Sequence, residues 1–132
     1  MIAKLKILLL PALLLVTTAL RADTCDIRVS LLTCSTGEEL YAGFGHTSIR
    51  VQTQGMDIVF NYGTFNFDEP NFYSKFVRGR LKYYLSAENF SDFLPTYQYE
   101  KRNVYEQELL LDCEAKKSIF NALRQNIQEE NK

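Results

Sequence analysis

The stretch His46-Thr-Ser-Ile-Arg-Val-Gln-Thr-Gln-Gly-Met-Asp-Ile-Val-Phe-Asn-Tyr62 has the pattern of a β-hairpin. Apolar and polar side chains alternate on both sides of Gln54-Gly55, and a period of two is typical of strands. Gln54-Gly55 suits a two-residue hairpin turn, so we expect strands over His46–Gln52 and Asp57–Tyr62. The pattern therefore indicates an antiparallel pair of strands in this part of the chain.

The hairpin turn also decides which side chains share a face of the sheet. Pairing through Gln54-Gly55 places residue 48 opposite residue 61 and residue 46 opposite residue 63. One face is apolar, and we expect it to form the core: it carries Ile49, Val51, Ile58, Phe60 and Tyr62. The other face carries His46, Ser48, Arg50 and Asn61. Asn61 would then lie diagonally next to His46, close enough for its amide to orient the imidazole.

Further strands and helices are expected on both sides of the hairpin. Strand-like runs cover Ile27–Thr33, Arg80–Leu85 and Asn103–Leu111. Three helices are predicted. Pro70 can open a helix over Asn71–Val77, and Ser86 can cap a helix over Ala87–Phe93 that ends before Pro95. Asp112 can cap a final helix, which carries Ile119, Leu123 and Ile127 on one face. Together these elements predict an α+β fold of antiparallel strands and short helices.

Residues 1–22 have the three parts of a secretory signal peptide. Two lysines precede an apolar run over Ile7–Leu20, and the small Ala22 offers a cleavage site. The run is shorter than the roughly 20 apolar residues that a membrane span needs, which favours a cleaved signal over an anchor. We therefore expect residues 23–132 to be an exported domain.

The exported part is expected to be acidic. The whole chain has 15 Lys and Arg against 16 Asp and Glu. Residues 1–22 hold three of the basic residues and no acidic one, which leaves 12 against 16. A nucleic-acid partner is not expected, because phosphate binding favours a basic face.

The chain has three cysteines, which is an odd number for an exported protein. One pair among Cys25, Cys34 and Cys113 can form a disulfide and leave a free thiol, and the sequence does not decide which. With one histidine and no CxxC pair, the chain offers no metal-ligand set, and no cofactor is expected.

Two further groups of side chains are interpreted from the sequence. Six aromatic residues form an expected cluster, mostly in the core, with some able to line an apolar channel: Tyr83, Tyr84, Phe90, Phe93, Tyr97 and Tyr99. Five basic residues are interpreted as a solvated face: Arg78, Arg80, Lys82, Lys101 and Arg102.

His46 is the candidate catalytic base. A histidine held by a polar neighbour is the base half of a Cys-His or Ser-His site. Gly43 and Gly45 precede it and would let the backbone approach a ligand. Cys34 could supply the nucleophile, or it could be part of a disulfide. A solvated or purely structural histidine is the alternative interpretation of this pattern.

Three segments resemble a known family. They are Gly43-Phe-Gly-His46, Val59-Phe-Asn-Tyr-Gly-Thr-Phe65 and Pro70-Asn-Phe-Tyr-Ser-Lys-Phe76. Together they are similar to the N-terminal periplasmic domain of the Lnb lipoprotein N-acyltransferases of Gram-negative envelopes. The resemblance covers about residues 27–132.

This resemblance implies an enzyme that adds a third acyl chain to the N-terminal amine of a diacylated lipoprotein, with a phospholipid as acyl donor at the membrane surface. It also implies a rearranged papain-like or NlpC/P60-like domain in which histidine precedes cysteine. His46 would be the base and Asn61 its orienting partner. The nucleophilic cysteine of the family pattern lies in an Asp-Asn-Cys segment beyond the final helix, and Cys34 is the alternative.

The resemblance further implies a full-length protein anchored in the inner membrane, of which this chain would be the periplasmic domain, incomplete at its C-terminus. Two other functions fit the same residues. One is a non-catalytic exported module that binds lipid or lipoprotein through its aromatic residues. The other is a thiol peptidase or amidase, because the same Cys-His arrangement cleaves peptides when water is the acceptor.

Overall fold

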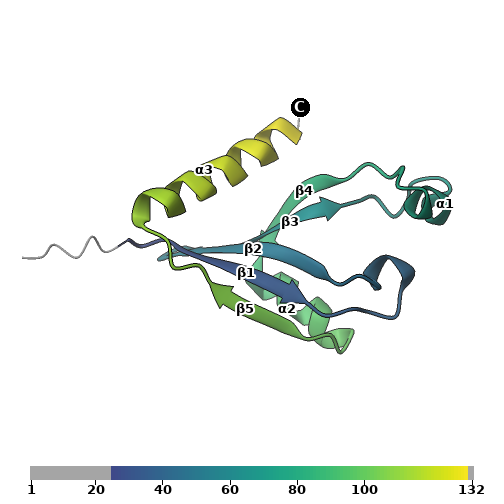
Figure 1. Ribbon diagram of the computed structural model, residues 1–132, viewed down its shortest axis with the longest axis horizontal. Helices are drawn as coiled ribbons and strands as arrows, with labels where there is room; N and C mark the ends of the chain where they lie inside the picture. The colour runs from purple at the N-terminus through teal and green to yellow at the C-terminus, as the bar shows by residue number, and fades with distance from the viewer. Residues whose placement is uncertain (1–24, 131–132) are drawn as a thin grey trace, which may run out of the picture.

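A computed structural model describes residues 25–130, and the predicted signal peptide lies outside them. Five strands form one antiparallel sheet in the order β4-β3-β2-β1-β5 (Figure 1). The strands are β1 (Arg28–Cys34), β2 (His46–Thr53), β3 (Met56–Thr64), β4 (Tyr84–Asn89) and β5 (Val104–Glu108). The helices are η1 (Leu40–Ala42), α1 (Phe72–Val77), α2 (Phe90–Tyr99) and α3 (Cys113–Glu130). The predicted α+β class is confirmed.

The central hairpin has the predicted turn and register. Thr53 pairs with Met56 across the turn, and Ile49 pairs with Phe60, which is the register that places residue 48 opposite residue 61. The alternation of side chains between the two faces therefore follows the sequence pattern.

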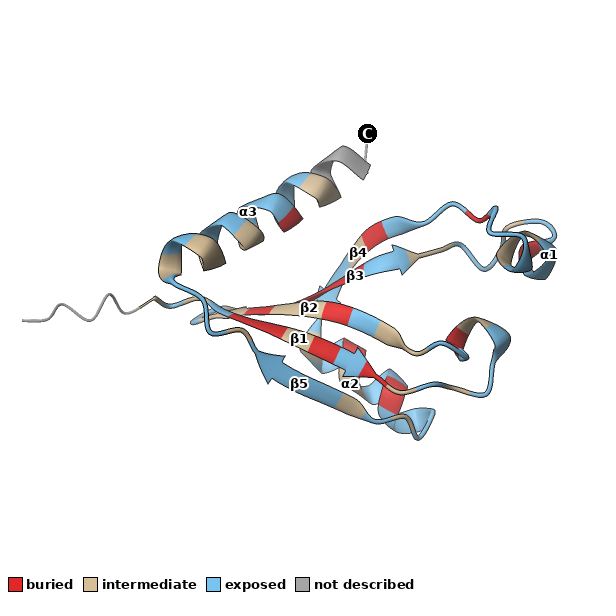
Figure 2. Ribbon diagram, in the orientation of Figure 1, coloured by how far each residue is buried: buried red, intermediate tan, exposed pale blue. Residues whose placement is uncertain are grey.

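Each face of the sheet is covered by a helix, α3 on one side and α2 on the other (Figure 1). The α3 face buries an aliphatic and aromatic core formed by Val51, Phe60, Leu85 and Leu123. The α2 face buries a second core formed by Leu32, Cys34, Val59, Phe93 and Tyr97. The predicted apolar face is confirmed except for Tyr62, which is 46% exposed. The face with His46 also holds a core, because β1 and α2 contribute apolar residues to it. Figure 2 shows buried positions along β1, β2 and β3, whereas the edge strand β5 is mostly exposed.

The predicted strand over Arg80–Leu85 and helix over Ala87–Phe93 are wrong in their bounds. The strand β4 continues to Asn89, because its residues pair with β3, with Ala87 opposite Phe60. Pairing with a neighbouring strand overrides the local helix signals of this segment. The helix α2 therefore begins only at Phe90.

Pro95 lies inside α2, although we expected the helix to end before it. A proline removes the hydrogen bond to the carbonyl four residues earlier, which here is Ser91. Ser91 and Pro95 are both exposed, so water can reach that carbonyl. Phe93 and Tyr97 are buried against the sheet and stabilise the helix on both sides of the proline.

The final helix begins as predicted. The backbone amide of Ala115 donates to Asp112 Oδ1 over 2.7 Å, which is a helix N-cap bond. Leu123 packs on the α3 face with Ile119 and Ile127, so the predicted helix face is confirmed. Cys113, the first residue of this helix, forms a disulfide with Cys25, and Cys34 is left as a buried free thiol.

The connection between β3 and β4, residues 65–83, forms what we call the aromatic lobe. Its rings contact one another, and Tyr41 from the β1–β2 connection packs edge-on against Phe65, Phe67 and Phe72. The predicted aromatic cluster is wrong in its membership: Phe90, Phe93 and Tyr97 stack along α2, and Tyr99 is 90% exposed.

Candidate active site

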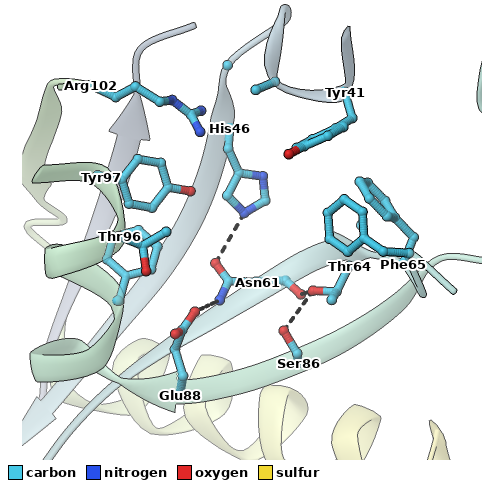
Figure 3. Close-up of a pocket in the computed structure, with 15 residues that line it drawn as sticks. Tyr41, His46, Asn61, Thr64, Phe65, Ser86, Glu88, Thr96, Tyr97 and Arg102 are labelled. Carbon is cyan, nitrogen blue, oxygen red and sulfur yellow. Dashed lines mark hydrogen bonds between the residues drawn. The ribbon is translucent and has the colours of Figure 1, made fainter. Parts of the chain in front are cut away.

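A cleft of about 310 Å³ opens where the start of β2 meets the aromatic lobe and α2 (Figure 3). Polar groups gather on its floor and aromatic rings on its walls. It is lined by Tyr41, Ala42, Gly45, His46, Asn61, Gly63, Thr64, Phe65, Phe67, Ser86, Glu88, Phe93, Thr96, Tyr97 and Arg102.

His46 is the first residue of β2, and Gly45 allows the chain to enter the strand at this point. Gly45 has a positive φ of 74°, and a Cβ atom there would lie 2.6 Å from the carbonyl oxygen of Cys34. Only glycine fits both conditions. At this close approach of the end of β1 and the start of β2, His46 lies directly opposite Cys34 in the β1–β2 register.

Asn61 holds the imidazole from the neighbouring strand. His46 Nε2 lies 3.1 Å from Asn61 Oδ1, so the predicted contact between the two side chains is confirmed. Asn61 Oδ1 also accepts a hydrogen bond from Ser48 Oγ over 2.6 Å. Its amide nitrogen donates to Glu88 Oε1 over 2.8 Å (Figure 3). Asn61 is buried, so these bonds replace its contacts with water.

This network assigns the tautomer of the neutral imidazole. A carboxylate only accepts, so Glu88 fixes the amide nitrogen of Asn61 on its own side and leaves Oδ1 facing His46. An oxygen acceptor requires that Nε2 carries the proton, which leaves a lone pair on Nδ1. Figure 3 shows this second ring nitrogen on the side of Tyr41, whose hydroxyl points into the same space. The basic nitrogen of His46 therefore faces the cleft.

Glu88 is the outer end of this chain of hydrogen bonds, because the residue is partly exposed to solvent. Burial raises the pKa of the Glu88 carboxyl, and the hydrogen bond from Asn61 partly offsets that increase in pKa. The sequence interpretation missed Glu88, because it placed this residue in a helix. Its position in β4 beside Asn61 follows only from the strand pairing, in which Glu88 lies opposite Val59.

Arg102 and Tyr97 form the opposite wall. The Arg102 side chain is 9% exposed, and its guanidinium carbon lies 4.6 Å from the centre of the Tyr97 ring. Its Nε donates to the carbonyl oxygen of Ser35 over 2.9 Å, and its Nη1 pairs with Glu100. The interpretation of Arg102 as part of a solvated face is wrong, because its side chain is almost fully buried. No local sequence pattern indicates that Arg102 packs against α2.

Cys34 lies beneath Tyr97 and does not line the cleft. Its residue exposure is 3%, and the Tyr97 hydroxyl is hydrogen-bonded to its sulfur. Burial raises the pKa of the Cys34 thiol, which disfavours the reactive thiolate. The structure therefore brings His46 and Asn61 together in the cleft and keeps Cys34 below its surface.

Arg50, on the same face of the sheet, belongs to a structural ion-pair network instead. Its guanidinium binds both carboxylate oxygens of Asp57, at 2.7 and 2.6 Å, and also Glu106 at 3.0 Å. Its carbon lies 3.4 Å from the centre of the Phe90 ring. The hydrogen bonds from Arg50 lower the pKa of Asp57. This network fixes α2 and β5 against the hairpin.

Two further properties concern the described part of the chain. Residues 25–130 contain no group of three or more His, Cys, Asp or Glu side chains arranged to hold a metal ion. None of the helices in that range combines the length and the hydropathy of a membrane span.

Comparison with known families gave a match over most of the chain. A model of the Lnb N-terminal periplasmic domain matches residues 17–132, which is most of the chain. Searches of curated proteins and of solved structures found nothing that matches. The chain therefore belongs to the Lnb N-terminal periplasmic domain family, and the family's description places this domain in the periplasm.

Proposed function

We propose that this domain supplies the general base of a thiol-dependent lipoprotein N-acyltransferase. His46 would be the base and Asn61 the residue that orients it. The observation that carries the proposal is the 3.1 Å contact between His46 Nε2 and an Asn61 amide that Ser48 and Glu88 hold in one orientation. A base whose free nitrogen faces a cleft has the arrangement that nucleophile activation requires.

The reaction would proceed in two acyl-transfer steps. In the first, His46 Nδ1 takes the thiol proton, the sulfur attacks a phospholipid ester carbonyl, and a thioester forms. The proton on His46 passes to the departing glycerol oxygen, which leaves as a lysophospholipid. In the second, the N-terminal amine of a diacylated lipoprotein attacks the thioester, and an amide replaces the carbon–sulfur bond. The amine proton passes through His46 to the released thiolate.

The thiol in this scheme is proposed to come from a segment that follows α3, as the family resemblance implies. Cys34 is the less suitable candidate, because it is buried, hydrogen-bonded to Tyr97 and raised in pKa. To act, it would require Tyr97 to move away from the cleft wall. The aromatic side chains Phe65, Phe67 and Tyr41 on the cleft wall suit the apolar acyl chain of either substrate.

The domain organisation follows from the same proposal. Residues 1–22 would be cleaved on export, and residues 23–132 would form the periplasmic domain. The full-length protein would be anchored in the inner membrane, where diacylated lipoproteins and phospholipid donors meet.

The test is an acyl-transfer assay on the product of the whole gene, in membranes that contain a diacylated reporter lipoprotein. Mass spectrometry of the reporter's N-terminal peptide measures the added acyl chain. We expect His46→Ala to abolish the transfer and Cys34→Ser to retain it. Tyr99→Ala, at an exposed position away from the cleft, is the matched control.

Three results would redirect the proposal. Full transfer by the His46→Ala variant would overturn the catalytic role and favour the non-catalytic binding module. Loss of transfer in a folded Cys34→Ser variant would identify Cys34 as the nucleophile. Release of free fatty acid or cleaved peptide, without acylation of the reporter, would favour the thiol peptidase or amidase.

A further inference from the structure

The aromatic lobe has an outer surface that, apart from Phe67 on the cleft wall, the proposed acyl-transfer chemistry does not use. Four large apolar or aromatic side chains of the lobe remain exposed: Phe67 at 57%, Tyr73 at 57%, Val77 at 71% and Tyr83 at 48%. Single exposed apolar residues are common, whereas several within one short connection are typical of a segment that contacts a partner.

The same connection is rich in cations. Lys75, Arg78, Arg80 and Lys82 all follow Glu69, and residues 70–83 contain no acidic residue. Lys75 is paired with Glu69 at 2.7 Å. The other three basic residues are exposed, and the ion pairs of the described residues include none of them. The cations therefore remain available to an external anionic group.

The lobe is also adjacent to the cleft. Phe65 and Phe67 line the cleft and pack against Tyr41, so the exposed surface and the cleft wall share side chains. Figure 1 shows α1 at one end of the molecule, beyond the ends of β3 and β4. A surface that the lobe contacts would thus lie next to the mouth of the cleft.

We propose that the aromatic lobe docks on an anionic phospholipid surface, with Tyr73, Val77 and Tyr83 in the headgroup layer and Arg78, Arg80 and Lys82 on the lipid phosphates. Aromatic side chains combined with Lys and Arg are typical of segments that lie in the membrane interface. The surface is limited to the lobe, because the neighbouring β1–β2 connection carries the acidic Glu38 and Glu39. Docking does not depend on His46, so it stands apart from the proposed chemistry.

The experiment measures co-sedimentation of the purified chain with two kinds of vesicle: phosphatidylcholine alone, and phosphatidylcholine mixed with phosphatidylglycerol. We expect binding to the mixed vesicles, and weaker binding as the salt concentration rises. Each cation near an anionic surface contributes about fivefold in binding, so Arg78→Gln, Arg80→Gln and Lys82→Gln together should lower it roughly 100-fold. Tyr73→Ser combined with Val77→Ser should lower it several-fold.

Two kinds of control distinguish docking through the lobe from non-specific hydrophobic adsorption and from the catalytic proposal. Tyr99→Ser and Leu110→Ser remove side chains that are 90% and 95% exposed outside the lobe, and binding should not change. His46→Ala should also bind as the unmodified chain does. Since all substituted positions of the lobe are exposed, circular dichroism should show unchanged folding.

Two results would overturn the proposal. One is a failure of the charge dependence: equal binding to neutral and mixed vesicles would remove the role of the cations, and no binding to either would leave an acidic protein partner as the occupant of the lobe. The other is an equal loss of binding in the Tyr99→Ser or Leu110→Ser control. Loss of acyl transfer with intact vesicle binding would count against the proposed function alone.

Discussion

The two faces of the sheet are made by the same strands but have different contents. The α3 face buries only apolar side chains. The α2 face buries the polar Ser30, Ser48 and Asn61 among its apolar residues, and His46 lies at its open end. Buried polar groups lower stability unless they are hydrogen-bonded, so a folded domain does not need them for packing alone. We interpret the α3 face as the part that stabilises the fold and the α2 face as the part that carries chemistry.

The largest expected effect that tests this comparison is on the α2 face. His46→Gln should lower the rate of acyl transfer by about 10³-fold or more, because proton transfer by a positioned base contributes up to about 10⁴-fold. The free energy of unfolding should change by less than about 1 kcal/mol, since the residue is only half-buried. Transfer assays and urea unfolding of the same variant measure the two quantities. A large loss of stability would show that His46 serves the fold.

The matched substitution on the α3 face is Leu123→Ala. Leu123 is 3% exposed in the core of that face, and a cavity there should cost about 2–4 kcal/mol of unfolding free energy. Transfer activity per folded molecule should stay unchanged, because α3 does not line the cleft. Urea unfolding gives the stability, and assays well below the unfolding temperature give the activity. A loss of activity in the folded variant would contradict the division between the two faces.

A smaller effect is expected at Asn61, which links the cleft to the fold. Asn61→Ala removes the acceptor that holds His46 and should lower the transfer rate by up to about 100-fold through misplacement of the ring. ¹⁵N NMR of the imidazole should show the proton on Nε2 in the unmodified protein and a mixture of tautomers in the variant. Ser48→Ala leaves Asn61 held by Glu88 alone, so it should change the tautomer and the rate less than Asn61→Ala does. The same tautomer population in the unmodified protein and in Asn61→Ala would refute the orienting role of Asn61.

The smallest effect concerns Asp57, whose role on the α2 face is structural. Its pKa is lowered in the folded state by hydrogen bonds from Arg50, so it stabilises the fold above its unfolded pKa. That contribution is lost as the pH falls from near 4 toward the lower folded pKa. Because the Asp57 side chain is 39% exposed, solvent screening limits the contribution to about 1 kcal/mol. The free energy of unfolding, measured by urea at several pH values in this range, should depend less on pH for Asp57→Asn than for the unmodified chain.

The hairpin and the contact between His46 and Asn61 were predictable because both depend on local pattern. Alternation and the Gln54-Gly55 turn determine the register, and the register determines which side chains meet. The catalytic roles of these residues stay predictions. The final helix was also predictable, because its cap at Asp112 and its apolar repeat are written within one segment.

The remaining part of the cleft depends on contacts between distant segments. Glu88 reaches Asn61 only because β4 extends to Asn89, and that boundary is set by pairing with β3 rather than by local preference. Arg102 reaches the cleft only because it packs on Tyr97. The pairing of Cys25 with Cys113 similarly requires the two chain segments to meet in the fold. Contacts between segments that are distant in the sequence leave no local pattern, so these neighbours could not be predicted from it.

The disulfide has a consequence for the order in which the fold assembles. The strands β1 to β4 pair with their neighbours along the chain, whereas β5 must return to β1 across most of the domain. Cys25 and Cys113 lie 88 residues apart and flank this late pairing. A crosslink over such a span removes about 4–5 kcal/mol of loop-closure entropy from the unfolded chain in the chain-entropy description. Oxidation outside the cytoplasm would thus favour closure of the β1–β5 edge, and reduction would first release β5 and α3 while the four-stranded meander with the His46 hairpin remains.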